Sequence, residues 1–592
     1  MPPISDPDYA ALIAEEVPTP SDPVIKQFLA ARDALRDEEQ RQRSDHSFRH
    51  SLSPLARRAH AIVARIRDQE HKTIWTPDLD ETLATTKSEE RPAGMTVHPG
   101  MAFSLAKGLM EGTKLWGIVR RLPKGGLLHA HLDAMVDVDH LLEVVMRTKG
   151  MCVASLEGRM DGEEARRRAD VQVKFRGDGG GTDEAAGGLW TGGYKVGEWV
   201  GVEEAAEGFP EGGREGFLRW LKSRCVLSRT DAVEQHHGPD EIWKKFIGCF
   251  RVLGSFLHYE PIWRAFLRRL MTLLVEDGVS WVEIRFAWPL DYCREGSDVP
   301  EPDYDHMFTV LSEELDRFRA TPEGASFWGI RMIWTSIRSG PTRSIIQSMD
   351  DCIATKLSHP TLLSGYDLVG LEDGGRPLSS LLPELFWFRK QCALEDVTIP
   401  LFLHAGETLG DGTEADGNLY DAVLLGTRRI GHAFSLYKHP RLVEAVKDRR
   451  VLVESCPISN EMLRLTGSIM QHPLPALLAR GVACALCNDD PAILGQDTAG
   501  MTHDFWQALQ GWENLGLAGL GSLAENSVRW AAFEDQTAEE WTKDIKEASM
   551  GSGIKAKRLQ EWAVAWERFC LWIVTEYGEE YGDDEDEGGA ST

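Results

Sequence analysis

Eight short apolar segments, each followed by enough chain for a helix, constrain the fold of this sequence more than any other feature. A regular alternation of strand and helix patterns is typical of α/β proteins with a parallel sheet. Eight such repeats are the number that a (β/α)8 barrel requires. The sequence therefore predicts an α/β fold of the TIM-type (β/α)8 barrel class. The expected strands are Gly126–Leu132, Trp281–Ala287, Gly329–Thr335, Tyr366–Leu371, Ile399–His404, Arg429–Ala433, Val451–Ser455 and Val482–Asn488.

The remaining sequence divides into segments around this pattern. Glycines are dense between Gly158 and Gly216, which predicts an insertion with long flexible loops after the first strand. The last residues are strongly acidic, which is typical of a solvated tail. The predicted segments are an N-terminal helical extension (1–100), the start of the barrel (101–149), a glycine-rich inserted region (150–245), the remainder of the barrel (246–535), C-terminal helices (536–575) and an acidic disordered tail (576–592).

The charge of the chain excludes one large class of partners. Lys and Arg number 65 and Asp and Glu number 93, so the formal net charge is −28 at pH 7. A protein that follows a nucleic-acid backbone needs a basic surface to displace counterions, so we expect no nucleic-acid partner. No apolar run of about 18 residues occurs, so we also expect no membrane-spanning helix.

Three weak signals bear on the compartment. The N-terminal sequence MPPISDPDYAALIAEEVPTP has neither the basic region nor the apolar segment of a secretory signal. The ten cysteines lack the regular spacing of a disulfide framework, and no asparagine begins an N-x-Ser/Thr glycosylation site. Together these signals predict a cytoplasmic protein.

Polar side chains gather at the carboxyl ends of the expected strands, where barrels of this kind build their sites. His129 and His131, at the end of the first strand, are separated by one residue. Alternation along a strand directs both imidazoles to the same face, which provides half of a metal site. Taken alone, this motif is explained equally well by two surface or core histidines.

Two further motifs complete a set of metal ligands. His404 ends the fifth strand and is followed three residues later by Glu407, and the eighth strand runs into Asp489-Asp490-Pro491. An ordinary turn explains the Asp-Asp-Pro motif when it is taken alone. Three imidazoles and a carboxylate from three strand ends suit zinc, with a water completing an open catalytic site.

The motifs also occur in an order that resembles the zinc-dependent adenosine deaminases of the amidohydrolase superfamily. The matching segments are LPKGGLLHAHLD, FLHAGE, RIGHAF, SCPISN and NDDP. The fuller resemblance, over about residues 100–535, is to the adenosine deaminase-related growth factor subfamily. It rests on Trp243, Phe246, Phe250 and Tyr259-Glu260-Pro261, on the segment GYDLVGLEDGGRPL, and on the long insertion after strand one.

This resemblance implies hydrolytic deamination of adenosine and 2′-deoxyadenosine to inosine and 2′-deoxyinosine, with release of ammonia, by a zinc-activated hydroxide that attacks purine C6. Glu407 is implied to deliver a proton to N1, and His432 to hold and polarise the hydroxide. Asp490 is implied to accept a hydrogen bond at N7, the Gly370 N–H to donate to N3, and Asp133 to bind the ribose 5′-hydroxyl. The ligands implied for one Zn2+ per chain are His129, His131, His404 and Asp489.

The 5′ end of the substrate leaves an alternative open. A carboxylate at Asp133 would repel a 5′-phosphate, which favours the nucleoside over AMP. Basic residues of the insertion favour instead a deaminase of AMP, ADP or ATP, because they are suited to a lid that binds phosphates. These residues are Arg166–Arg168, Lys174, Arg176 and Lys195.

Two other classes of function are less favoured. Binuclear amidohydrolases also begin with His-x-His, but they need a bridging carboxylate or modified lysine at the end of strand four, where this chain has DLVGLED. A non-catalytic protein that binds a partner through the insertion has no need for the complete ligand set together with Glu407.

In the related subfamily the N-terminal region supports dimerisation, and the amphipathic stretch Leu55–Ile66 is compatible with a homodimer.

Overall fold

The computed structural model describes residues 5–14, 18–76, 98, 100–177, 188–234, 238–287 and 291–582. All eight expected strands are present, and they form two four-stranded parallel sheets with the orders β1-β5-β6-β7 and β11-β10-β9-β8. Neighbours in each sheet are consecutive among these strands along the chain. The strands are β1 (Gly125–Leu127), β5 (Val279–Phe286), β6 (Gly329–Ile337), β7 (Leu363–Val369), β8 (His404–Ala405), β9 (Arg429–His432), β10 (Leu452–Ser455) and β11 (Cys484–Leu486).

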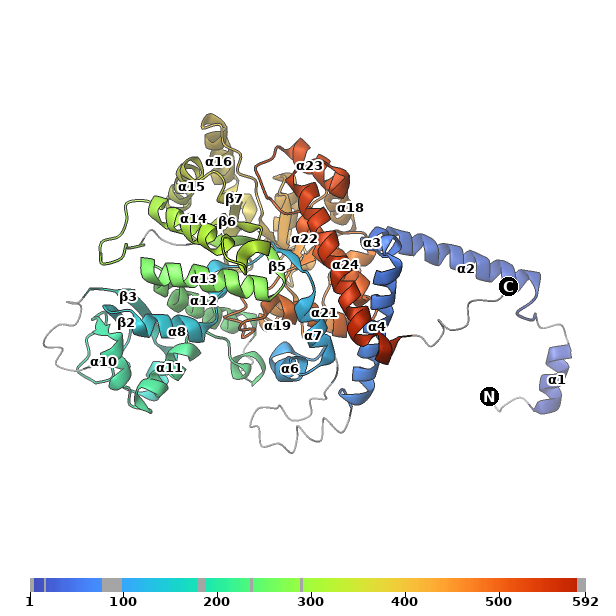
Figure 1. The fold of residues 1–592 in the computed structure, drawn as a ribbon, viewed down its shortest axis with the longest axis horizontal. Coiled ribbons are helices and arrows are strands. Elements are labelled where there is room, and N and C mark those ends of the chain that lie inside the picture. Colours follow the sequence, from blue (N-terminus) through green and yellow to red (C-terminus); the bar gives the residue numbers. More distant parts are fainter. Residues whose placement is uncertain are drawn as a thin grey trace.

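At least one helix follows each of these strands, which confirms the predicted α/β class with a parallel sheet (Figure 1). Helices α13, α15 and α22 pack directly on strands of the two sheets. The helices of this part are α8 (Val138–Arg147), α12 (Pro239–Phe256), α13 (Glu260–Glu276), α14 (Asp305–Arg319), α15 (Thr342–Ser358), α16 (Leu382–Leu394), α17 (Glu414–Leu424), α18 (Pro440–Asp448), α19 (Pro457–Met462), α20 (Leu474–Ala479), α21 (Gly500–Gly511) and α22 (Gly516–Arg529).

The two sheets meet at both of their edges through single backbone bridges. Tyr366 of β7 pairs with Leu401, just before β8, and Ala130, just after β1, pairs with Asp489, just after β11. The fifth expected strand is reduced to the two residues of β8, and Pro400, which has no N–H to donate, lies within the missing part. The carboxyl ends of all eight strands therefore lie around one region.

Over residues 150–177 and 188–234, the inserted region forms helices and strands where its glycine content predicted flexible loops. Its described part contains a three-stranded antiparallel sheet with the order β3-β2-β4. Val171 and Val173 of β3 are fully buried, so one face of this small sheet is part of the core. The elements are β2 (Met151–Glu157), α9 (Glu163–Arg168), β3 (Asp170–Phe175), β4 (Val200–Gly201), α10 (Val202–Glu207) and α11 (Gly213–Ser223).

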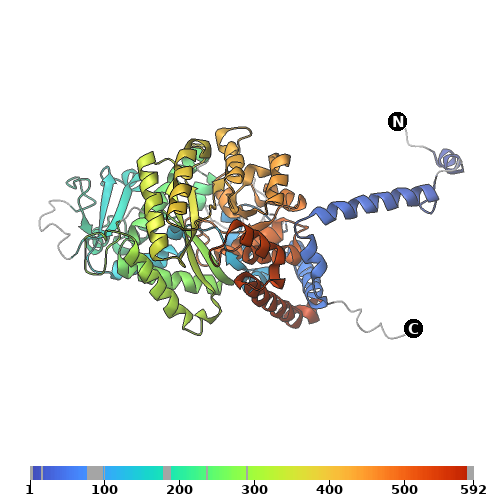
Figure 2. The same cartoon turned by 90° about the horizontal axis from the view of Figure 1, so that it is seen from above.

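The predicted N-terminal extension is helical over its described residues. Helix α4 contains the amphipathic stretch Leu55–Ile66, but Ile62, Val63 and Ile66 are buried and α4 packs along α24 (Ile554–Tyr581) of the same chain. Helix α2 instead extends away from the body, opposite the insertion (Figures 1 and 2). The helices of this extension are α1 (Asp6–Ala14), α2 (Pro23–Gln42), α3 (His46–Ser51) and α4 (Pro54–Thr73). Helices α6 (Phe103–Met110) and α7 (Lys114–Arg121) follow it and lead to β1.

The C-terminal helices extend further than composition predicted. After α23 (Ala538–Glu547), helix α24 continues through Tyr581, beyond residue 575, where the acidic disordered tail was expected to begin. The ammonium of Lys114 on α7 lies 2.8 Å from a Glu580 carboxylate oxygen and donates to the Tyr581 hydroxyl at 2.7 Å. These contacts with a distant helix explain the extra turn. The rest of the expected tail, 583–592, lies outside the described residues.

Two general features of the described chain bear on its setting. None of the described helices combines the length and the apolar character needed to cross a membrane. All ten cysteines are buried, and all are free thiols.

Candidate metal centre and substrate cavity

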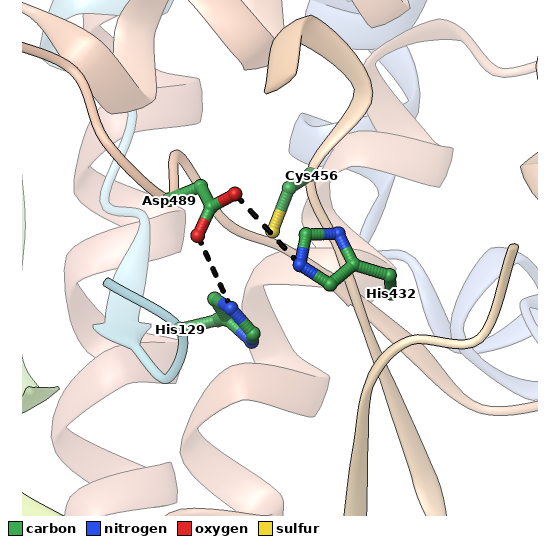
Figure 3. Close-up of side chains that lie close together, drawn as sticks. All are labelled: His129, His432, Cys456 and Asp489. Carbon is green, nitrogen blue, oxygen red and sulfur yellow. Dashed lines mark ion pairs between the residues drawn. The ribbon is translucent and has the colours of Figure 1, made fainter. Parts of the chain in front are cut away.

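Four histidines and one aspartate converge at the carboxyl ends of the strands. His129 and His131 follow β1, His404 lies on β8, His432 ends β9, and Asp489 follows β11. Figure 3 shows the Asp489 carboxylate between the rings of His129 and His432. Its Oδ1 atom lies 3.2 Å from Nε2 of His129 and 3.3 Å from Nε2 of His131. The ligand atoms of His129, His131 and His404 lie within 4.8 Å of one another.

The predicted ligand set fits a small divalent cation. A tetrahedral zinc site with ligand distances of about 2.0–2.1 Å has edges of about 3.3 Å, which matches the separations of Asp489 Oδ1 from the two imidazole nitrogens. His129 Nε2 and Asp489 Oδ1 are buried and make no hydrogen bond with protein groups. Buried polar atoms are almost always paired, so these two atoms indicate a ligand between them.

Cys456 lies beside the same cluster, and its sulfur lies within 4.8 Å of a nitrogen or oxygen of each of His129, His432 and Asp489 (Figure 3). Burial and a hydrogen bond with Cys487 raise the pKa of the Cys456 thiol well above its ordinary value. Because the thiolate is the form that binds metals, this neutral thiol is a poor ligand. The donor chemistry therefore favours the three histidines and Asp489.

Removal of one predicted ligand provides a direct test of the metal centre. We expect the His404→Ala variant to bind zinc at least about tenfold more weakly, since an open catalytic site has only a few protein ligands. Zinc content after dialysis, measured by elemental analysis, checks this expectation. His439→Ala is the matched control, because His439 also lies close to a carboxylate, Asp416 at 2.9 Å, but belongs to none of the candidate metal clusters found among the described residues. Full zinc in His404→Ala would remove that residue from the ligand set.

Buried carboxylates fix the orientation of two ligand rings. Asp367 on β7 lies 2.6 Å from Nδ1 of His404, and Glu454 on β10 lies 2.8 Å from Nδ1 of His129. A carboxylate on Nδ1 fixes the imidazole tautomer and leaves Nε2 available for a metal. The position of Asp367 on the fourth expected strand was visible in the sequence, whereas the role of Glu454 was not predicted.

Arg285 on β5 is the main site residue that the sequence analysis missed. Its guanidinium donates to Asp367 at 2.7 Å and to Glu454 at 2.7 Å, and it also donates to the carbonyls of Leu128 and Phe402. One fully buried cation thus holds both carboxylates that orient the ligand histidines, and it links the two sheets. A charged residue within the apolar strand sequence WVEIRFA was the available signal.

The local backbone brings the rings close together. An added Cβ at Gly431 would lie 2.7 Å from Cε1 of His129, so only glycine leaves room for that ring. His432 and Asp489 both have left-handed backbone conformations, with φ of 61° and 57°. Such strain in non-glycine residues is concentrated at functional sites.

Glu407 lies at the edge of the metal cluster, three residues after His404. Its carboxylate is 3.6 Å from Nδ1 of His432, and its backbone N–H donates to Glu372 at 2.9 Å. Burial raises the pKa of the Glu407 carboxyl well above its ordinary value, and the charges of Asp489 and Glu372 raise it further. Burial lowers the pKa of His432 well below its ordinary value. Both shifts favour the neutral form of the side chain, for Glu407 and for His432 alike.

A cavity of about 350 Å³ opens above these groups, a volume within the usual range for small-molecule sites. Helix α12 contributes an aromatic wall from Trp243, Phe246 and Phe250, the residues that also carried the family resemblance. The cavity brings together every predicted catalytic and substrate-binding residue and three of the four predicted metal ligands. These lining residues are Asp133, Gly370, Glu407, His432, Asp490, His131, His404 and Asp489.

The basic residues proposed for a phosphate-binding lid are mostly placed elsewhere. Only Lys174 lines the cavity. Arg166 is buried and pairs with Glu211, and Arg176 stacks on Trp199. Arg167 and Arg168 form exposed pairs one turn apart on α9 with Glu163 and Glu164. The described insertion therefore presents no cluster of cations to the cavity.

The sequence of this chain is similar to those of known proteins. Residues 228–548, more than half of the chain, match the family model for adenosine deaminase. Adenosine deaminase 2-A of Danio rerio is 29% identical over 467 residues, which cover 78% of this chain and 86% of that protein. Adenosine deaminase 2 of Sus scrofa is 30% identical over 465 residues, covering 76% and 85%. The solved adenine deaminase of Arthrobacter aurescens has 16% identity and a TM-score of 0.44 over 72% of this chain and 100% of that one.

The family model and the sequence relatives show a deaminase-type hydrolase: the chain belongs to the adenosine deaminase family. Relatives named adenosine deaminase 2 match over most of the chain, which confirms the predicted resemblance to the adenosine deaminase-related growth factor subfamily.

Proposed function

We propose that this protein is a zinc-dependent adenosine deaminase that converts adenosine and 2′-deoxyadenosine to inosine and 2′-deoxyinosine with release of ammonia. The observation that carries this proposal is the placement of Glu407, His432 and Asp490 beside the ligand cluster, at one cavity of nucleoside size. His129, His131, His404 and Asp489 would hold one Zn2+. When bound, zinc makes water acidic enough to supply a nucleophile at neutral pH.

Two side chains of this protein would then carry out the proton transfers, one as a donor and one as an acceptor. Glu407, protonated because its pKa is raised by burial, gives a proton to N1 of the purine and so makes C6 more electrophilic. His432, neutral because burial lowers its pKa, accepts a proton from the attacking water and holds it by a hydrogen bond. Gly370 has a φ of 106°, a conformation in which glycine presents its N–H to N3 without a side chain in the way.

The expected role of Asp490 requires a correction. The resemblance was taken to make this carboxylate accept a hydrogen bond at N7, but N7 of a neutral purine has a lone pair and no hydrogen. Burial and the charges of Asp489 and Glu407 raise the pKa of Asp490 well above its ordinary value, and its Oδ1 is buried without a hydrogen-bond partner. A protonated Asp490 therefore donates to N7.

The charges that line the cavity favour a nucleoside over a nucleotide. Among the described residues, the cavity has three lysine or arginine side chains, and each is paired with an acid. Asp133 adds a carboxylate near the end expected to receive the 5′-hydroxyl, where it would repel a phosphate. The alternative, a deaminase of AMP, ADP or ATP, rests on Lys174 alone. The three pairs are Arg285 with Asp367, Arg251 with Asp170, and Lys174 with Asp291.

Ammonia release from a panel of adenine compounds tests this proposal. We expect turnover of adenosine and 2′-deoxyadenosine, with AMP, ADP, ATP and free adenine much slower. Preference for a phosphorylated compound would establish the alternative substrate. Zinc-loaded protein without turnover of any compound would favour the non-catalytic class, in which the insertion binds a partner.

A substitution at Asp133 tests how the protein recognises the 5′ end of the substrate. We expect Asp133→Asn to weaken adenosine, because a hydrogen-bond acceptor for the 5′-hydroxyl is lost, and to raise kcat/KM for AMP relative to adenosine by about tenfold, because repulsion is lost. Parallel kinetics on the two substrates measure this ratio. An unchanged ratio would show that Asp133 does not read the 5′ end.

Three further features belong to the proposal. The edge bridges and the Arg285 link between the sheets support a closed eight-stranded barrel. Ten free, buried thiols support a cytoplasmic location, where thiols stay reduced. A homodimer is supported by α2, where Phe28 and Leu35 are 68% and 66% exposed, and not by Leu55–Ile66, whose apolar face is covered within the chain.

A further inference from the structure

Strand β3 of the insertion reaches the substrate cavity. Successive side chains of a strand point to opposite faces, so the residues of β3 that face the cavity alternate with residues that do not. Val171 and Val173 are fully buried, whereas Gln172 and Lys174 line the cavity. The insertion is thus part of the cavity wall, and Lys174 is the only one of its predicted basic residues to lie there.

The ammonium of Lys174 is joined to a carboxylate of the main fold. It forms an ion pair with Asp291, which lies beyond the end of β5 and also lines the cavity. Nδ1 of His258, just after α12, lies 3.7 Å from the same carboxylate. The side chains of Lys174 and Asp291 are only 24% and 31% exposed, so solvent screens this pair less than it screens a surface pair.

A series of close contacts places the Lys174–Asp291 pair near Asp133. The backbone N–H of Val173, next to Lys174, donates to the Ser255 hydroxyl at 3.1 Å. The neighbouring residue, Gly254, faces Asp133 so closely that an added Cβ would lie 3.1 Å from its carboxylate. Lys174 and Asp133 are therefore on adjacent parts of the cavity wall, at the end assigned above to the ribose 5′ position.

We propose that Asp291 is a specificity-determining residue, which neutralises Lys174 and so prevents this ammonium from binding a 5′-phosphate. The inference rests on the proposed function, and it explains how a lysine can line the cavity of an enzyme that prefers nucleosides. Without the carboxylate, Lys174 would be a half-buried cation beside the 5′ end, which is the arrangement that attracts a phosphate.

The test is the ratio of kcat/KM for AMP to that for adenosine. We expect Asp291→Asn to raise this ratio by about tenfold, with the gain reduced at high salt, because the new attraction is electrostatic. The double variant Asp291→Asn/Lys174→Met should return the ratio to that of the unchanged protein. The matched control is Asp139→Asn, which removes the carboxylate 2.6 Å from Lys222 at a pair that does not line the cavity.

The outcomes separate this inference from the function on which it rests. A protein that turns over adenosine, but whose ratio is unchanged in Asp291→Asn, would overturn the role of Asp291 and leave the deaminase intact. A gain that persists in the double variant would also overturn it, because Lys174 would not be the group that binds phosphate. Failure of the unchanged protein to deaminate adenosine would instead contradict the proposed function.

Discussion

The Glu407→Gln variant is expected to retain zinc and fold while losing about 10³-fold in kcat for adenosine. The amide keeps the shape of the side chain but has no acidic proton to give to N1. Among the described residues, Glu407 belongs to none of the groups that could hold a metal ion, so the metal content should not change. The measurement is kcat from initial rates, together with zinc content and thermal unfolding on the same preparation.

Glu461→Gln is the matched control for this change. Glu461 is also buried, and burial raises its pKa to about 8. Its carboxylate accepts hydrogen bonds from the Gln507 side chain and the Phe103 N–H, and it does not line the cavity. We expect turnover close to that of the unchanged protein. A Glu407→Gln variant with near-normal turnover would show that another group delivers the proton.

The second large effect is expected from Arg285→Lys. A lysine ammonium cannot hold Asp367 and Glu454 at once in the way that the planar guanidinium does. The rings of His404 and His129 then lose their fixed orientation, so we expect zinc affinity to fall by about 10- to 100-fold. Competition with a chelating indicator measures this affinity without any need for enzyme activity.

Arg331→Lys separates this positioning role from a general effect on the core. Arg331 lies on the neighbouring strand β6 and is 2% exposed. Its guanidinium donates hydrogen bonds to Asp535 and to the carbonyls of Ala532 and Leu363, none of which is a predicted metal ligand. We expect both substitutions to lower the thermal stability, since both disturb buried hydrogen bonds. Only Arg285→Lys should weaken zinc binding, and equal zinc affinities in the two variants would contradict the positioning role.

The strands and the polar residues at their ends could be predicted from the sequence because both depend on local patterns. Each β-segment carries its own apolar run, and side-chain alternation alone sets the directions of His129 and His131. The Arg285 network could not be predicted in the same way. Its partners Asp367 and Glu454 come from strands far along the chain. Asp367 lies on β7 of the same sheet as Arg285, and Glu454 lies on β10 of the other sheet.

The structure differs from the prediction in parts of the insertion and of the C-terminal end, because amino-acid composition carries no information about long-range contacts. The glycines of 150–245 predicted loops, yet Val153 of β2 pairs with Val173 of β3, and both side chains are buried. The acids after 575 predicted disorder, yet Glu580 and Tyr581 contact Lys114 on α7. In both cases the stabilising partner lies outside the window from which the prediction was made.

The proposed function is deamination of adenosine with a metal held by His129, His131, His404 and Asp489. The most direct test is ammonia release from adenosine by one preparation as purified, after removal of metal with a chelator, and after addition of zinc. We expect turnover that disappears with the metal and returns when zinc is added, in proportion to the zinc bound. Undiminished turnover by protein that elemental analysis shows to be free of metal would contradict it.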